Sequence, residues 1–432
     1  MVNISHRVLW LSCLLIFCVN TASSEDNPIK KMADSIKGLF VPDPDVGRTA
    51  QQLIKSRAFG SETHHVTTQD GYILGVVRIT NAKIKGQLKG PVLLQHSLMA
   101  SAQCWLNNSP LDGLNDGNDA EVGHNLGFEL AKRGYDVWLG NSRGTDYSKN
   151  HTKFHSKSKA FWNFSIDEMI KYDMPATIDY ILNITKHPTI GYVGYNQGTA
   201  LMFGLLASET KYNDIIKPFI ALGPLVLVNK ETTAPLMFKQ SGNGGGNKMI
   251  DMFAKKEGSY LDAKAMRNFG QSSCKNEPQC YLTVKSMEPF MGRQNIENTN
   301  VTRWSIYLFS ESLSESAKNI HQWNQQYAHD NRKFTMYDYG EKSNNERYGQ
   351  STPKPYDLSQ IKNKYISVYY SENDGVVGPE DVHDLELQVS ATKMEMNLIH
   401  DKEFSHSDFL FGKNTDSMIN SKVVETIQKY DE

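Results

Sequence analysis

Short apolar runs alternate with amphipathic stretches through the first half of the chain. The apolar runs predict strands at 92–94, 135–139, 190–193 and 219–222, and the stretches between them have helical spacing at 125–133, 167–182 and 199–209. Apart from Asp136 in 135–139, each predicted strand is an unbroken apolar run, which is typical of strands buried on both faces of a parallel sheet. The order of strands and helices therefore predicts an α/β fold with a mostly parallel central sheet.

The region before these strands has a different pattern. A helix is expected at 51–58, followed by two β-rich runs on either side of the pair Asp70-Gly71. A short turn of this kind between β-rich runs predicts an antiparallel hairpin. Further along, Pro175 is expected to interrupt the helix at 167–182, because proline cannot donate a backbone hydrogen bond.

The alternation stops between about 229 and 345. This segment contains a glycine-rich run at 242–246, two cysteines and scattered aromatic residues, which together predict a helical insertion. No strand-to-helix frame surrounds the glycine run and no Lys-Ser/Thr pair follows it, so we interpret it as a flexible loop rather than a phosphate-binding loop. The strand pattern returns at 365–370 and 396–399, and a closing helix is expected at 417–430.

The first 24 residues have the order of a secretory signal peptide. Arg7 precedes an apolar run at 8–19 that is too short to span a bilayer, and small residues follow at 21–24. A signal anchor is the alternative interpretation. No other stretch is a candidate for crossing a membrane, so we expect a secreted protein, with the lysosome as the alternative destination. The expected organisation is a signal peptide at 1–24, a core in two parts at 25–228 and 346–432, and the insertion at 229–345.

The composition is that of an ordinary globular protein. Forty-six basic and 48 acidic residues give a formal net charge of -2, which offers no electrostatic case for binding nucleic acid or an anionic membrane surface. Cys274 and Cys280 stand six positions apart in a polar stretch, which suits a small disulfide-closed loop in an oxidising compartment, and Cys104 is expected to be buried and unpaired. Glycosylation sequons, also consistent with export, stand at Asn107, Asn150, Asn163, Asn183 and Asn300.

Two segments compete for the sharp strand-to-helix turn that carries the nucleophile in many serine hydrolases. Segment 140–144 (GNSRG) has the pattern Gly-x-Ser-x-Gly around Ser142, but a polar stretch without helical spacing follows it. Segment 194–198 (GYNQG) has Asn196 at its centre, yet it lies between a predicted strand and a predicted helix. Because the turn depends on backbone geometry, we place the nucleophile position at Asn196 and interpret 140–144 as a structural loop.

Long stretches of the chain resemble the acid lipase family of α/β hydrolases. The similar segments are 70–74 (DGYIL), 134–144 (GYDVWLGNSRG), 161–169 (FWNFSIDEM), 172–178 (YDMPATI), 192–199 (YVGYNQGT), 373–374 (ND), 379–382 (PEDV) and 406–409 (HSDF). The resemblance covers nearly all of the chain after the signal peptide. It implies an α/β-hydrolase core, a helical cap with a lid over the site, hydrolysis of neutral-lipid esters, and a Ser, Asp, His triad in that chain order.

Carried over by position, the resemblance assigns the triad acid to Asp374 and the triad base to His406, and Asn196 stands where the family has its serine. The family's oxyanion segment His-Gly-Leu is present as 96–98 (HSL). The backbone N–H groups of Leu98 and Gln197 are therefore the expected oxyanion donors, and a serine in place of the glycine reduces backbone freedom. No cofactor and no metal are expected.

An asparagine amide cannot be deprotonated by imidazole to attack an ester, so the covalent acyl-enzyme route is closed. We therefore expect a lipase-derived protein without catalysis that still binds a neutral lipid or fatty acyl ester. One alternative is an active lipase or esterase, through water activated by His406 and Asp374, through deamidation of Asn196, or through Ser142. A hydrogen bond between Ser142 and His406 would favour that alternative. Another is a protein that works through its surface and keeps only a relic of the pocket.

Overall fold

The structure is a computed structural model that describes residues 43–110, 124–228, 250–252, 254–260, 263–274, 277–300, 303–309, 314–328 and 332–431. The chain divides into two compact units, Met1–Pro44 and Asp45–Glu432, and the elements described below belong to the second. The expected signal peptide and the glycine-rich run at 242–246 lie outside the described residues. Within the described part of the chain, no helix is long and apolar enough to cross a membrane.

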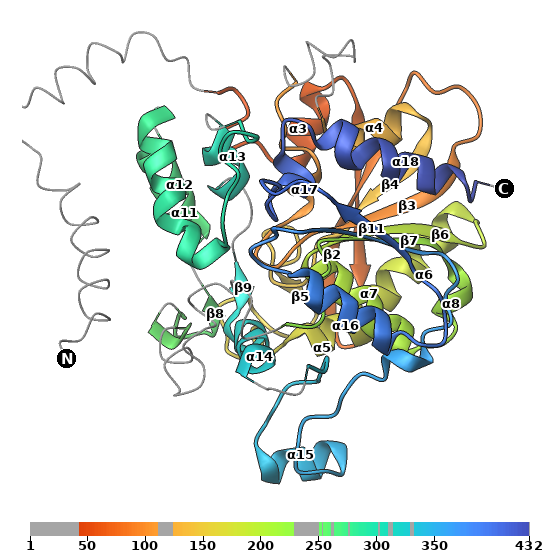
Figure 1. The fold of residues 1–432 in the computed structure, drawn as a ribbon, viewed down its shortest axis with the longest axis vertical. Helices are drawn as coiled ribbons and strands as arrows, with labels where there is room; N and C mark the ends of the chain where they lie inside the picture. Colours follow the sequence, from red (N-terminus) through yellow and green to blue (C-terminus); the bar gives the residue numbers. More distant parts are fainter. Residues whose placement is uncertain are drawn as a thin grey trace, which may run out of the picture. The chain divides into compact units, whose positions relative to one another are not determined.

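A nine-stranded sheet forms the centre of the second unit (Figure 1). Its order is β1-β2-β4-β3-β6-β7-β10-β11, with β5 paired to β2. The strands are β1 (Gly60–Thr67), β2 (Tyr72–Thr80), β3 (Lys89–Gln95), β4 (Tyr135–Leu139), β5 (Asn150–His151), β6 (Ile190–Tyr195), β7 (Ile216–Leu222), β10 (Ile366–Ser371) and β11 (Glu395–Ile399). Pairs from β4 to β11 are parallel, whereas β1, β2 and β5 pair antiparallel. The predicted parallel sheet and the hairpin at Asp70-Gly71 are confirmed.

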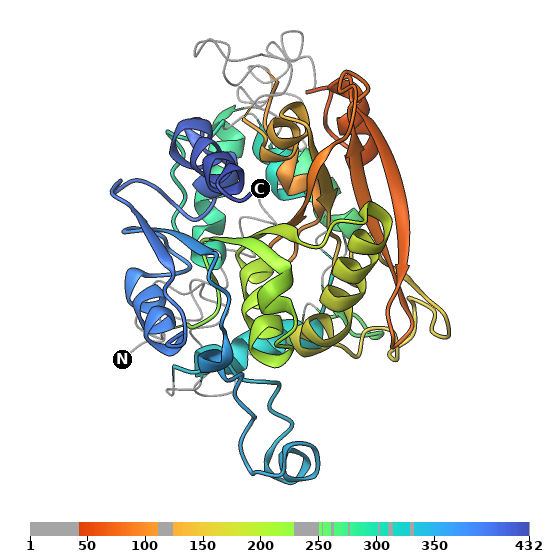
Figure 2. The ribbon, with the colours of Figure 1, turned by 90° about the vertical axis from the view of Figure 1, so that its right-hand side faces the viewer.

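Helices cover both faces of the sheet, as Figures 1 and 2 show. One core includes residues of α6 (Met174–Thr185), α7 (Gln197–Ser208) and α16 (Pro379–Gln388), and the other includes residues of α3 (Ala50–Ser56), α4 (Leu126–Lys132) and α18 (Ser421–Gln428). Within β7, Phe219 and Ala221 belong to the first core, whereas Ile220 and Leu222 belong to the second. Because alternate residues of one strand point to opposite faces, a strand buried in this way must be apolar throughout.

The helix expected at 167–182 is present, but the prediction that Pro175 interrupts it is wrong, because the backbone stays helical from Ile166 to Thr185. A short α5 (Ile166–Glu168) passes into a π-helical turn at Met169–Asp173, and α6 begins at Met174 with Pro175 in its first turn. The π turn shifts the backbone hydrogen-bond pattern just before Pro175, and such local changes accompany a proline that has no N–H to donate. Shorter elements are α8 (Tyr212–Ile215), α17 (Asp408–Phe411), 3-10 turns at Ala102–Trp105 and Leu358–Gln360, and a second π turn at Asp416–Asn420.

The segment between β7 and β10 is largely helical. Its described elements are α11 (Ala263–Ser273), α12 (Glu277–Met291), α13 (Trp304–Phe309), α14 (Ala317–Ala328), α15 (Glu341–Tyr348) and the antiparallel pair of β8 (Ser259–Tyr260) and β9 (Glu315–Ser316). The predicted disulfide between Cys274 and Cys280 links the end of α11 to the start of α12. In Figure 1, α11, α12 and α13 lie beside the sheet and α15 projects away from it. Helix α15 continues across position 345, and the domain limits stay a prediction.

Candidate active site

Asn196 lies on the sharp turn between the end of β6 and the start of α7. Its backbone has φ 53° and ψ -118°, and asparagine tolerates a positive φ better than most side chains. The flanking residues Gly194 and Gly198 must be glycines, because there is no room for a side chain at either position. A Cβ on Gly194 would lie 2.8 Å from the carbonyl group of Gly198, and a Cβ on Gly198 would lie 2.5 Å from the carbonyl oxygen of Gln95. Backbone therefore closes the turn on both sides.

The structure brings the three predicted triad positions together from separate loops. Asp374 follows β10 and His406 follows β11, so both come from the edge of the sheet where parallel strands end. Asp374 Oδ2 lies 2.6 Å from His406 Nδ1, and His406 Nε2 lies 2.9 Å from Asn196 Nδ2. All three residues are more than nine-tenths buried. The arrangement is that of a triad with an amide in the first position.

Neighbouring groups fix the acid and the imidazole in place. Asp374 Oδ1 accepts hydrogen bonds from the N–H groups of Val376 at 2.8 Å and Val377 at 3.1 Å, which leaves Oδ2 for the imidazole. The His406 ring stacks on the Tyr195 ring with centroids 5.0 Å apart. The Tyr195 hydroxyl also donates to the carbonyl oxygen of His406 at 2.9 Å. The imidazole is therefore held in both position and orientation.

The Asn196 side chain makes two hydrogen bonds that fill the reaction centre. A carboxylate can only accept, so His406 Nδ1 carries the hydrogen that is donated to Asp374. In the neutral imidazole Nε2 is then an acceptor, and the amide of Asn196 donates to it. Asn196 Oδ1 in turn accepts from the backbone N–H of Leu98 at 3.3 Å. One amide thus bridges the imidazole and an expected oxyanion donor.

A buried histidine organises the segment that carries Leu98. Burial lowers the pKa of His96 to about 4, so the ring is neutral. His96 Nδ1 donates to the carbonyl oxygen of Ser97 at 2.7 Å, and Nε2 accepts from the N–H of Ser142 at 3.0 Å. The Ser97 hydroxyl donates to the carbonyl oxygen of Leu98, and Met99 has a positive φ of 58°. The Ser97 side chain is thus accommodated by its own hydrogen bond.

Ser142 is not part of this constellation. Its hydroxyl oxygen accepts a hydrogen bond from Gln95 Nε2 at 3.0 Å. Both ring nitrogens of His406 are already engaged, by Asn196 and by Asp374. Ser142 is therefore hydrogen-bonded to Gln95 and not to His406. These contacts agree with the interpretation of 140–144 as a structural loop.

Arg143 explains the sequence of that loop. Its buried guanidinium pairs with Asp70 and Asp173, each at 2.6 Å, and lies 4.0 Å from the ring centroid of Tyr72. Gly144 has a φ of 90°, and a Cβ at this position would lie 2.8 Å from the ring of Phe164. The Gly-x-Ser-x-Gly pattern at 140–144 therefore belongs to a loop that places Arg143 between its two acidic partners.

The insertion holds Gln197, the second residue with an expected oxyanion donor. Gln197 Oε1 accepts hydrogen bonds from Asn319 Nδ2 at 2.9 Å and from Trp323 Nε1 at 2.7 Å, both on α14. The sequence marked Trp323 only as one of several aromatic residues of the insertion. Its pairing with the nucleophile turn could not be predicted, because more than a hundred residues separate the two segments.

Glu315 on β9 is a second residue that the sequence did not single out. Its side chain is buried, and it accepts a hydrogen bond from the N–H of Ser316 at 2.8 Å. It also interacts with the side chain of Asn319 and with the backbone of Met99, beside Leu98. Burial raises the pKa of Glu315 to about 8. A single carboxyl group thus connects the insertion to the oxyanion segment.

The predicted glycosylation sites differ in exposure. Asn150, Asn163 and Asn183 are exposed and Asn300 is half-buried. Asn107, by contrast, is completely buried, and its carbonyl oxygen accepts two hydrogen bonds from the buried side chain of Arg303. The burial of Asn107 argues against a glycan there. All five sites stay predictions.

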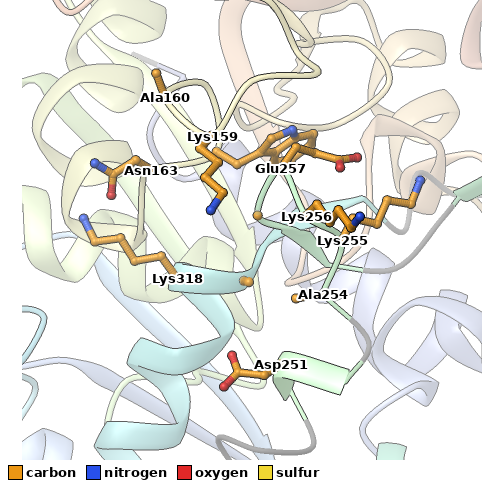
Figure 3. A pocket seen from close by; sticks show the side chains of 12 residues that line it. Lys159, Ala160, Asn163, Asp251, Ala254, Lys255, Lys256, Glu257 and Lys318 are labelled. Carbon is orange, nitrogen blue, oxygen red and sulfur yellow. The ribbon is translucent and has the colours of Figure 1, made fainter.

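A separate pocket of about 700 Å³ opens between the insertion and the loop before α5 (Figure 3). Its charged lining consists of Lys159, Lys255, Lys256, Lys318, Asp251 and Glu257. Lys318 pairs with Glu168 at 3.3 Å, and Asp251 pairs with His321 at 3.0 Å. Because its charges are of both signs and partly paired within the protein, we assign this pocket no ligand. The described residues hold no cluster of three or more side chains suited to a metal ion.

Comparison with known proteins identifies the family. A model of the α/β hydrolase fold matches residues 90–406, and a model of the partial α/β-hydrolase lipase region matches residues 50–109. The chain is 33% identical over 402 residues to gastric triacylglycerol lipase of Bos taurus, covering 90% of this chain and 93% of that protein. It is 31% identical over 400 residues to lipase member K of Homo sapiens, covering 90% and 92%, and 30% identical over 396 residues to lipase lipl-1 of Caenorhabditis elegans, covering 89% and 93%. The chain belongs to the acid lipase family of α/β hydrolases.

Proposed function

We propose that this protein is a secreted member of the family that does not hydrolyse esters and that retains binding of a neutral lipid or fatty acyl ester. One observation carries the proposal. The amide of Asn196 donates a hydrogen bond to His406 Nε2 at 2.9 Å, from the position on the turn where a serine hydrolase of this fold has its nucleophile. The expected signal peptide and the disulfide support secretion.

The chemistry of an amide closes the covalent route. A serine hydroxyl can give its proton to imidazole and attack an ester carbonyl, whereas a side-chain amide donates a hydrogen bond without becoming a nucleophile. Loss of the nucleophile from a Ser-His-Asp triad lowers turnover about a millionfold. The activity that remains, on the order of a thousandfold or more over water, comes from the oxyanion hole and from binding. Asn196 Oδ1 already occupies the Leu98 donor, so this remainder is reduced as well.

Lipid binding is supported by the relatives and by the residues near the turn. The Bos taurus relative is named a triacylglycerol lipase. Leu98 and Met99, on the oxyanion segment, are partly buried apolar side chains packed against the core, and buried Val376 follows the triad acid. Apolar surroundings with a few directed polar groups are typical of small-molecule sites. An acyl chain is therefore a better match for this site than a polar substrate.

One alternative has an observation in its favour. The Asp374–His406 pair is intact at 2.6 Å, so His406 has the partner that a general base needs. In that alternative, water activated by His406 would hydrolyse an ester without a covalent intermediate. It requires Asn196 to leave Nε2, which it occupies in this structure.

The test compares ester hydrolysis by the wild-type protein and by Asn196→Ser, with substrates from short-chain esters to triacylglycerol and from acid to neutral pH. We expect no turnover by the wild type and measurable turnover by the variant, because serine places a hydroxyl beside His406. Asn196→Ser combined with His406→Ala is the matched control and should abolish the gain. Turnover by the wild type that Asn196→Ser merely equals would refute the loss of catalysis. Failure of the wild type to bind a fluorescent triacylglycerol would refute the retained binding.

A further inference from the structure

We infer that the amide of Asn196 is an internal ligand of the site, and that the site therefore selects uncharged lipids with a hydroxyl group over fatty-acid anions. The inference rests on the proposed function, because it assumes that a lipid enters beside Asn196. It adds the chemical class of the polar end that the site accepts.

A carboxylate finds few donors at this turn. A negatively charged oxygen bound there depends on the two backbone N–H groups of the oxyanion hole. Leu98 N–H already donates to Asn196 Oδ1. Gln197 N–H remains, since Gln197 is the first residue of α7 and has no intrahelical acceptor, and so does the second hydrogen of Asn196 Nδ2, because the first is donated to His406. Two neutral donors do not offset the cost of taking a carboxylate out of water beside Asn196 Oδ1.

The negative charge of Asp374 also disfavours binding of a fatty-acid anion. Asp374 is a buried carboxylate, and His406 is neutral in the hydrogen-bond pattern that includes Asn196. Among the described residues, no basic side chain other than His406 lies within ion-pair distance of Asp374. A fatty-acid anion next to Asn196 would therefore face a like charge in a poorly solvated setting.

A hydroxyl group matches the same surroundings, because it both donates and accepts. Asn196 Oδ1 has two lone pairs, and Leu98 uses one of them. The other can accept from a lipid hydroxyl, whose oxygen can accept in turn from Gln197 N–H. Long-chain alcohols, sterols and partly esterified glycerols carry such a group. A carboxylate in the same place would meet Oδ1 oxygen to oxygen.

The first test measures dissociation constants for two ligands with the same chain, oleyl alcohol and oleate, at alkaline pH, by displacement of a fluorescent acyl probe. The wild type should bind the alcohol at least about tenfold more tightly. Asn196→Gly frees the Leu98 donor, removes the Oδ1 atom that would face a carboxylate oxygen, and suits the positive φ. Its affinity for oleate should therefore rise about tenfold, even though the amide donor is lost, without a matching gain for the alcohol. Asn196→Asp keeps the shape and the Leu98 contact and adds a charge, so oleate should gain nothing. Equal affinities in the wild type, or an unchanged ratio in Asn196→Gly, would overturn the selectivity.

The second test needs no lipid. In protein labelled with ¹⁵N-leucine, the Leu98 amide hydrogen should exchange at least about tenfold faster in Asn196→Gly than in the wild type, and as slowly in Asn196→Asp as in the wild type. Equal exchange in the wild type and the glycine variant would refute the internal ligand. If Leu98 is protected and none of the three proteins binds either lipid, the proposed lipid binding and the selectivity both fail, while the internal contact stands.

Discussion

Glu315→Gln should make the free energy of unfolding depend less on pH, because it removes the ionisation of one buried carboxyl group. Burial raises the pKa of Glu315 from 4.5 to about 8, so the folded protein holds this proton more tightly than the unfolded chain. Folding then takes up a proton between these two values, and the free energy of unfolding falls as pH rises through that window. At about 1.4 kcal/mol per pKa unit, the loss reaches about 4–5 kcal/mol above pH 8 and vanishes below pH 4.5. Glutamine cannot ionise, so the variant avoids this loss.

The assay is equilibrium unfolding in urea of wild type and Glu315→Gln at several pH values between 4.5 and 8.5. The difference in free energy should grow in favour of the variant by about 1.4 kcal/mol for each pH unit until it levels off near pH 8. Burial also raises the pKa of Asp381 to about 7 and of Asp167 and Asp408 to about 6, but these groups are present in both proteins and cancel in the difference. A difference that stays constant from pH 5 to pH 8 would refute the reasoning.

Three further outcomes are expected. Gly198→Ala should lower the urea midpoint sharply or prevent folding, because its Cβ would lie 2.5 Å from a backbone oxygen, whereas Gly90→Ala, with no atom within 4 Å, should change little. Arg143→Met should lower the free energy of unfolding by about 3–5 kcal/mol, because Asp70 and Asp173 lose their cation. Lys211→Met breaks only an exposed ion pair and should lower it by less than about 1 kcal/mol. Peptide mapping of the secreted protein should find glycans at exposed sequons and none at Asn107, and an occupied Asn107 would contradict its burial.

Most of the fold could be predicted because the core alternates short apolar strands with amphipathic helices. Strand β6 carries no charged residue and β7 carries only Lys217, near its start, and helices of regular period separate such strands. The nucleophile turn could also be placed, because its glycines stand between a strand and a helix, although the letters at 140–144 match the pattern better. The structure gives the physical reason for preferring context. Gly194 and Gly198 face backbone atoms, whereas Gly144 faces aromatic side chains around Arg143.

The insertion could not be predicted in the same detail. Glu315 stands in a stretch without periodicity, and its partner Met99 is more than two hundred residues away. The contacts of Gln197 with Asn319 and Trp323 likewise join distant segments through single hydrogen bonds. The pattern of hydrophobic and polar residues within a short segment does not indicate which distant residues that segment contacts. The burial of Asn107 could not be predicted for a related reason, since a three-residue sequon does not report burial.

The same asparagine explains why losing a nucleophile need not damage the fold. A working hydrolase site keeps a base and oxyanion donors ready for a substrate, so their hydrogen-bonding capacity is incomplete until the substrate arrives. In this protein Asn196 tolerates the positive φ of the turn, donates to His406 and accepts from Leu98. The imidazole and the Leu98 N–H, which would have waited for an ester, are thus satisfied within the chain, whereas the Gln197 N–H stays available. We therefore expect Asn196→Ser to exchange stability for activity, because a hydroxyl can reach the imidazole but cannot also fill the oxyanion donor while it acts as a nucleophile.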